Sequence, residues 1–388
     1  MNIFLPKSAE FILSALKKHG FEGYIVGGCV RDLLLGRTPY DYDITTNALP
    51  SEIKNIFEKT IDTGIKHGTV TVVTQNDMVE VTTYRTENGY SDCRRPDSVN
   101  FVSNVKDDLA RRDFTVNAIC YNPECGFVDC FGGINDINNR TLKAVGDAKT
   151  RFREDALRIL RLFRFSSVLN FSIEKNTYLS ALECSSLLEN ISMERIASEL
   201  KKLSLGDNVS AISPLIKSGA LNFLFLSNTA SISKIALLPN NDTLRFFAFL
   251  NICSTNLKKT LSLLKLSKDF KDYCYSMYEL QNIDIKNDKV FIKKLLFLYG
   301  YDILRDIFTY KSIIKNENLK AQSKLTDEII KLNEPYKISS LALDGNDLKN
   351  LGISGKDIGI ALKKLLNEVI INPSNNTAEI LTEIITKK

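Results

Sequence analysis

Short apolar runs separated by turn residues fill the first 140 residues and predict strands that alternate with short helices. Residues 67–73 and 78–84 are rich in valine and threonine and flank the polar residues 75–77, a pattern that predicts a β-hairpin. Residues 24–26 form another apolar run, which ends at two glycines. Three leucines and Gly36 follow and predict a short helix with a glycine stop. The pattern therefore predicts a small head that mixes strands and helices.

Beyond residue 150 the pattern becomes helical. Leucine, isoleucine, lysine and glutamate recur at helical spacing almost without interruption to about residue 336. Pro335 and Tyr336 then precede a last helical module that extends to residue 388. Residues 10–18 combine apolar and charged positions as a surface helix does, rather than as a signal peptide does. We therefore predict an α+β protein in which a small mixed α/β head is followed by a long all-α part.

Composition narrows the classes of partner. The 388 residues are 44% apolar and carry a formal net charge of +5, which is small for a nucleic-acid-binding protein. Any contact with RNA must therefore come from local basic segments such as residues 143–164. The eight cysteines include no CxxC pair, which favours reduced thiols and a cytoplasmic location over a zinc site. No apolar stretch is long enough to span a bilayer, so we expect no membrane partner, and the sequence does not indicate an oligomeric state.

The most informative segment extends from Gly27 and Gly28 to Asp41 and Asp43. A strand that turns sharply into a helix leaves bare backbone N–H groups that can hold phosphate oxygens. Asp41 and Asp43 are two positions apart, and on an extended strand this spacing points both carboxylates to one face. Divalent cations that also hold nucleotide phosphates need such oxygen ligands. Each motif alone also fits a plain turn or a solvated strand end, but their ordered combination favours a metal-dependent nucleotidyl-transfer site.

A second polar segment lies at residues 107–118, where Arg111, Arg112 and Asp113 precede an apolar turn. Planar guanidinium groups suit phosphate and ribose oxygens, and a carboxylate can accept a hydrogen bond from a sugar hydroxyl. The alternative interpretation is a surface cluster of salt bridges. Taken alone, the segment slightly favours that alternative.

A third segment, residues 151–164, predicts a basic helix. On a helix, Asp155 and Arg158 lie one turn apart and face the same way, whereas Arg161 and Arg164 spiral onward. Cytosine and adenine both present an amino donor beside a ring-nitrogen acceptor, so one carboxylate and one guanidinium can read both bases. Uracil and guanine present the inverse pattern and would leave polar groups unmatched. The pair therefore predicts selection of CTP and ATP without a template strand, although a plain helix with a salt bridge is the alternative.

Taken together, these segments resemble the class II tRNA nucleotidyltransferases, the CCA-adding family of the polymerase β-like nucleotidyltransferase superfamily. The resemblance covers most of the chain. Its motifs are residues 27–32 with 41–43, residues 111–118, residues 154–158, and, more loosely, a hinge-like motif at 129–136 and a bracing helix motif at 194–200. It implies a nucleotidyltransferase head at residues 1–140, a neck with the template helix at 141–210, a helical body at 211–335, and a helical tail that binds tRNA at 336–388.

The resemblance also implies roles for single residues. Asp41 and Asp43 would bind Mg²⁺, the expected cofactor, which would activate the 3′-hydroxyl of tRNA and neutralise the leaving pyrophosphate. Glu80 is the candidate for a third catalytic carboxylate, and an outward-facing strand glutamate is an equally good interpretation. The residues expected to contact the incoming CTP or ATP are Gly28, Arg31, Arg112, Asp113, Asp155, Arg158, Arg161 and Arg164.

The motifs do not by themselves decide which nucleotides are added to the RNA. Residues 85–97 resemble a flexible loop that CCA-adding and A-adding enzymes retain, which disfavours addition of CC alone. The C-terminal segment mixes acidic, basic and apolar residues and is not strongly basic. We therefore favour CCA addition over poly(A) synthesis, and A-only addition is the next alternative. A catalytically silent RNA-binding protein should have lost a metal carboxylate or the base-reading pair, and both pairs are present. We therefore predict template-independent addition of CCA to the 3′ end of tRNA.

Overall fold

The computed structural model describes residues 3–75, 77–89 and 98–386, and the chain divides into two compact units. The first unit comprises Met1–Ala236 and Ile252–Lys265, and the second comprises Leu237–Asn251 and Leu266–Lys388. The first unit contains the predicted head and the helices that follow it. The predicted boundaries at residues 140, 210 and 335 fall inside these units, so the division into neck, body and tail stays a prediction.

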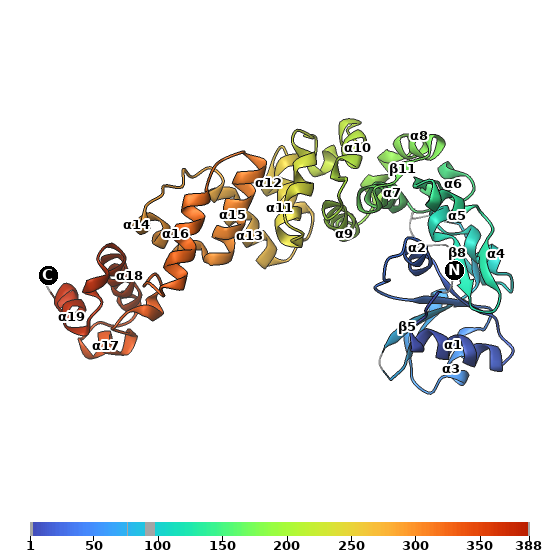
Figure 1. The fold of residues 1–388 in the computed structure, drawn as a ribbon, viewed down its shortest axis with the longest axis horizontal. Helices are drawn as coiled ribbons and strands as arrows, with labels where there is room; N and C mark the ends of the chain where they lie inside the picture. Colours follow the sequence, from blue (N-terminus) through green and yellow to red (C-terminus); the bar gives the residue numbers. More distant parts are fainter. Residues whose placement is uncertain (1–2, 76, 90–97, 387–388) are drawn as a thin grey trace. The chain divides into compact units, whose positions relative to one another are not determined.

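A mixed sheet forms the centre of the first unit. Within the described residues it has seven strands, in the order β3 (Thr60–Gly64), β4 (Thr69–Val73), β5 (Met78–Thr83), β2 (Asp43–Thr46), β1 (Gly23–Val26), β8 (Ile119–Asn122) and β9 (Gly126–Asp129). Neighbouring strands are antiparallel except β2 and β5, which are parallel. The antiparallel pairing of β4 with β5 confirms the predicted hairpin. In Figure 1, α1 (Lys7–Lys18) and α3 (Pro50–Ile56) lie below the sheet and α2 (Gly28–Leu34) lies above it.

The turn from β1 into α2 forms where the glycines predict it. Gly27 has a φ of +81°, a conformation that side chains other than glycine rarely adopt. A Cβ atom at this position would also lie only 2.9 Å from an Nη1 atom of Arg112, so the turn and that guanidinium pack closely. The turn rests on a buried cluster that includes Val26, Leu109 and Cys120. Sequence and packing thus agree on a sharp glycine turn at this point.

Helices dominate the rest of the first unit. They are α4 (Val105–Ala110), α5 (Gly133–Asn138), α6 (Ala148–Glu154), α7 (Leu157–Leu169), α8 (Lys175–Glu183), α9 (Met193–Ser204), α10 (Ser213–Lys217) and α12 (Leu257–Leu263). The unit also contains two short strand pairs, β6 (Arg85–Asn88) with β7 (Ser98–Phe101) and β10 (Thr141–Leu142) with β11 (Ser172–Ile173). The predicted flexible loop at residues 85–97 therefore begins as strand β6, and its residues 90–97 lie outside the described residues.

The expectation that Asp155 and Arg158 share one helix is wrong. Asp155 has an extended backbone and lies between α6 and α7. Its carboxylate accepts a hydrogen bond of 3.1 Å from the backbone N–H of Leu157, as side chains at helix starts do. This local bond competes with continuous helix, and residue spacing does not reveal it. Leu157, Leu160 and Phe163 of α7 are all buried and pack into the core.

The second unit consists of helices. They are α11 (Asp242–Cys253, which ends in the first unit), α13 (Lys268–Leu280), α14 (Lys289–Tyr299), α15 (Tyr301–Ile314), α16 (Lys320–Lys331), α17 (Gly345–Asn350), α18 (Lys356–Ile371) and α19 (Ala378–Thr386). The last three share a core that includes Leu348, Leu365 and Leu381. Among the described residues, no helix combines the length and the apolar character that crossing a membrane requires.

Candidate active site

Acidic side chains gather where β2 begins. Asp43 is the first residue of β2 and stands in register with Glu80 of the parallel neighbour β5, so both side chains lie on one face of the sheet. Burial, together with the negative charges of Asp41 and Glu80, raises the pKa of Asp43 to about 6. The Asp43 side chain nevertheless retains exposed surface, so it is crowded by protein and still open to a ligand. The structure therefore brings Asp41, Asp43 and Glu80 together.

This acidic group fits a divalent cation. A bound positive charge would favour the ionised form of Asp43, whose pKa the neighbouring acids raise, and oxygen ligands suit Mg²⁺. Within the described ranges, no three His, Cys, Asp or Glu side chains stand close enough to hold an ion by themselves. A cation at Asp41 and Asp43 would therefore complete its shell with water and substrate phosphate oxygens, as Mg²⁺ commonly does.

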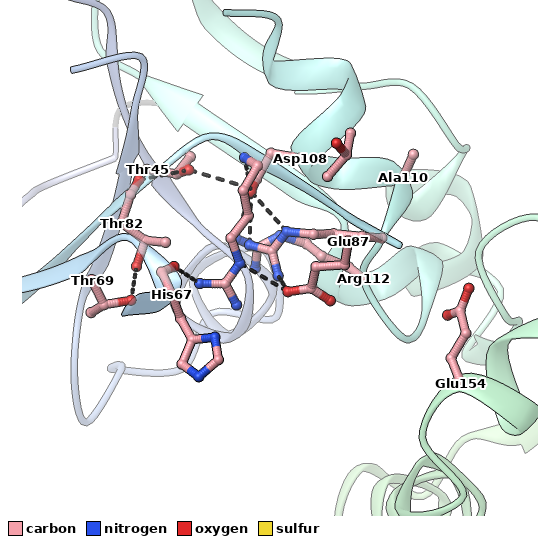
Figure 2. A network of polar contacts seen from close by, with 12 residues as sticks. Thr45, His67, Thr69, Thr82, Glu87, Asp108, Ala110, Arg112 and Glu154 are labelled. Atoms are coloured by element: carbon pink, nitrogen blue, oxygen red, sulfur yellow. Dashed lines mark hydrogen bonds and ion pairs between the residues drawn. The ribbon is translucent and has the colours of Figure 1, made fainter. Parts of the chain in front are cut away.

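Asp108, which the sequence analysis missed, anchors the second motif. Its side chain is 0% exposed, and it pairs with Arg111 at 2.7 Å and with Arg112 at 3.3 Å. The hydroxyl of Thr45 on β2 also donates to it at 3.3 Å (Figure 2). Although burial opposes ionisation, the charges of Arg112 and Arg111 hold the pKa of Asp108 below its usual range. Arg112 is thus fixed against the strand that carries Asp43. In the sequence, the three- and four-residue spacing between Asp108 and the two arginines is the signal that could have revealed these ion pairs.

The same network reaches β6. Glu87 accepts from Arg85 at 2.8 Å and from Arg111 at 3.1 Å, and Arg85 also donates to the carbonyl of His67 (Figure 2). The interpretation of residues 107–118 as a surface cluster of salt bridges is therefore wrong for Asp108, which is fully buried. Burial of a carboxylate requires such partners, and here they connect the sheet, α4 and the β6–β7 pair.

Arg31 and Asp113 belong to a second chain of polar contacts. Arg31 donates to Asn117 at 2.7 Å and pairs with Asp32 at 2.8 Å. Asn117 donates to Asp113 at 3.1 Å, and Arg161 pairs with Asp113 at 2.6 Å. Burial opposes ionisation of Asp113, but the charge of Arg161 and the Asn117 hydrogen bond hold its pKa well below the usual range. The predicted hydrogen bond from a sugar hydroxyl to Asp113 stays a prediction, and it would have to share a carboxylate that already has these partners.

Asp155 and Arg158 lie in one turn of chain but have separate partners. Asp155 accepts two hydrogen bonds from Arg195 of α9, at 3.2 and 2.8 Å. Arg158 is 8% exposed and donates to Glu154 at 2.7 Å and to the carbonyls of Arg151 and Arg111, both at 3.1 Å. These contacts use three of the five N–H groups of a guanidinium, so donors remain for a ligand. Each side chain is thus held in place by a partner other than its proposed companion.

Arg161 and Arg164 meet on a buried acid of α9. Glu199 lies 2.9 Å from Arg164 and 4.0 Å from Arg161, and it belongs to the predicted bracing helix motif. Arg161 keeps about a third of its side chain exposed, at 34%, whereas Arg164 is more enclosed, at 14%. The structure therefore brings both arginines to one place beside Asp113, with Arg161 the more accessible.

Comparisons with known proteins show the family of this chain. Residues 23–143 match the family described as the poly A polymerase head domain, and residues 170–231 match a probable RNA and SrmB-binding site of polymerase A. The CCA-adding enzyme of Staphylococcus haemolyticus is 39% identical over 399 residues, which cover 100% of this chain and 98% of that relative. The chain belongs to the family of CCA-adding enzymes. The relative from Lactococcus lactis subsp. cremoris (strain MG1363), also a CCA-adding enzyme, is 37% identical and covers 97% of this chain and 95% of its own length.

This chain is also similar in fold to a solved CCA-adding enzyme. The Bacillus stearothermophilus CCA-adding enzyme in complex with CTP has a TM-score of 0.83 and 30% identity, and covers 99% of this chain and 98% of its own. The family resemblance and the α+β fold class predicted from the sequence are therefore confirmed. Because these CCA-adding relatives match the chain from end to end, poly(A) synthesis is not favoured.

Proposed function

We propose that this chain adds CCA to the 3′ end of tRNA, using CTP and ATP and no nucleic-acid template. The observation that carries the proposal is the end-to-end match to CCA-adding enzymes, one of them solved with CTP. The acidic group of Asp41, Asp43 and Glu80, the arginines around Asp113 and the Asp155–Arg158 turn all lie in one compact unit, as this chemistry requires. We place the protein in the cytoplasm, where tRNA is its substrate.

In this proposal Asp41 and Asp43 hold Mg²⁺, and Glu80 is the third carboxylate of the group. The bound ion supplies positive charge that favours the ionised 3′-hydroxyl of tRNA and balances charge on the leaving pyrophosphate. The protein's own part is to orient the reactants. Asp108 keeps Arg112 beside the Gly27 turn, where the backbone and that guanidinium can receive phosphate oxygens.

Base selection is assigned to Asp155 and Arg158. The carboxylate would accept from the amino group of cytosine or adenine, and the free donors of Arg158 would reach the ring nitrogen. Arg195 and Glu154 hold the two side chains at fixed positions, which reduces the entropy lost when a base binds. The separate partners therefore support the proposal. If Asp155 and Arg158 were bonded to each other, that bond would have to break before a base could bind.

A direct assay separates the candidate activities. The purified protein is incubated with tRNA that lacks its 3′ end, Mg²⁺ and labelled CTP and ATP, and the products are sized. Addition of CCA supports the proposal, whereas a single adenosine or a long ladder would replace it by A-only addition or poly(A) synthesis. No incorporation, with tRNA still bound, would support the silent RNA-binding alternative.

Removing the residues after Lys337 should weaken tRNA binding by roughly tenfold and lower its dependence on salt, because exposed lysines would be lost. Among the described residues, the exposed lysines of this segment are Lys349, Lys356, Lys363 and Lys364. Ending the chain there keeps Glu334, which pairs at 2.8 Å with Lys293, a fully buried lysine. Fluorescence anisotropy at several KCl concentrations measures both quantities.

A full-length variant with these four lysines changed to glutamine serves as the matched control. It keeps the core of the last three helices and removes only the charge. Equal salt slopes for this variant and the intact protein would contradict a tail that binds the tRNA backbone.

A further inference from the structure

The ring of Phe165 on α7 lies among three guanidinium groups. The Cζ atom of Arg164 is 3.5 Å from the ring centroid, that of Arg31 is 5.2 Å away and that of Arg161 is 5.4 Å away. All three distances are within the range of cation–π attraction. Phe165 is only 5% exposed, so water competes little with these contacts. One aromatic side chain therefore contacts cations from α2 and from α7.

Such a cluster of like charges needs an explanation. Burial lowers the pKa of Arg164, the nearby Glu199 opposes this, and the charge of Arg161 lowers it further. Each arginine also pairs with an acid: Arg31 with Asp32, Arg161 with Asp113, and Arg164 with Glu199. Three guanidinium groups thus lie close together, and they offer phosphate oxygens several donors at one place.

A ring attracts guanidinium groups in a way that a carboxylate cannot. Its face carries partial negative charge but no net charge, so it orients cations without neutralising them. A further acid in this position would have repelled phosphates. Phe165 therefore gathers the arginines without adding another carboxylate that would compete with a ligand.

We propose that Phe165 is a positioning residue, whose ring holds Arg31, Arg161 and Arg164 as a preformed site for the triphosphate of incoming CTP or ATP. The inference rests on the proposed function. Arg31 lies in α2, which begins at Gly28, and α7 also carries Arg158. The ring thus fixes the phosphate end of the nucleotide relative to the residues assigned to its base.

A plain core role is the competing explanation. Phe165 also packs edge-on against Phe114, with ring centroids 5.9 Å apart, as many core aromatics do. If the ring only fills space, leucine should replace it with a loss of stability but no specific loss of triphosphate binding. The two explanations therefore differ in which ligand is affected.

Phe165→Leu should weaken CTP and ATP binding roughly 3- to 30-fold and leave CMP binding unchanged, because CMP lacks the β- and γ-phosphates. Phe165→Tyr keeps the ring face and should bind CTP within about twofold of the unaltered protein. Phe163→Leu removes a fully buried ring two residues earlier on the same helix and is the matched control. Titration calorimetry with CTP, ATP and CMP measures each affinity, and thermal melting measures stability.

Unchanged CTP binding by a folded Phe165→Leu protein would overturn the inference. So would an equal loss for CTP and CMP that Phe163→Leu reproduces. If the leucine variant does not fold, Phe165→Met offers a flexible side chain of similar volume and is judged by the same ratio of CTP to CMP affinity. The unaltered protein is assayed in parallel for CCA addition, so failure of the proposed function would be seen separately from failure of this inference.

Discussion

Replacing Asp43 by alanine should reduce transfer of both CTP and ATP to less than about one per cent, while tRNA binding stays nearly unchanged. The physical reason is that the charges of both Asp41 and Glu80 act on Asp43, which would help to hold the ion that both transfers need. Asp41→Ala should behave in the same way. Single-turnover incorporation with labelled CTP or ATP measures transfer, and anisotropy with labelled tRNA measures binding.

Two controls make this result specific. Asp62→Ala removes an exposed carboxylate from β3 of the same sheet and should leave transfer intact. Asp43→Asn should abolish transfer but raise the melting temperature of the metal-free protein slightly, because it removes a carboxylate whose charged form is disfavoured by its neighbours. Transfer by Asp43→Ala at the rate of the Asp62→Ala control would contradict the assignment of the metal site.

The elements around this site could be predicted from local sequence because their signals are local. The β4–β5 hairpin has its own turn, and the step from β1 into α2 depends on the backbone freedom of Gly27. The pairing of β5 with β2 could not be predicted in this way, since the two strands are distant in sequence and meet only in the sheet. That pairing is what brings Glu80 beside Asp43, and it supports Glu80 as the third carboxylate without establishing that role.

Other features depend on contacts that spacing does not encode. Asp108 looks like a surface acid in the sequence, yet it is buried because two arginines and Thr45 converge on it. Phe165 looks like an ordinary apolar position of a helix, and only the fold brings Arg31 to its ring. Residue types and their order therefore identified the chemistry of the site, whereas the positions of charges and rings required the tertiary structure.

The break between α6 and α7 changes how base selection should be understood. Helical spacing predicts that Asp155 and Arg158 lie one turn apart and face the same way. In the structure Asp155 is instead positioned by Arg195, and Arg158 by Glu154. Selectivity should therefore depend on the two positioning residues as well as on the two that would touch the base.

Arg158→Ala should lower the preference for CTP and ATP over UTP and GTP by roughly 10- to 100-fold, because the donors that would leave uracil and guanine mismatched are removed. Glu154 keeps a partner in this variant, since it also pairs with Arg151 at 2.7 Å, so the turn should remain folded. Competition assays with all four nucleotides on tRNA lacking its 3′ end measure the preference.

Matched variants distinguish base reading from a general loss of charge. Arg158→Lys keeps the positive charge but not the planar set of donors, and should also lose selectivity. Arg153→Ala removes an exposed arginine of α6 and should leave selectivity unchanged. Arg195→Ala frees Asp155 and should lower selectivity less than Arg158→Ala does, since the carboxylate is still present. An active Arg158→Ala protein that still rejects UTP and GTP would show that the base is read elsewhere, because this variant lacks the guanidinium assigned to the ring nitrogen.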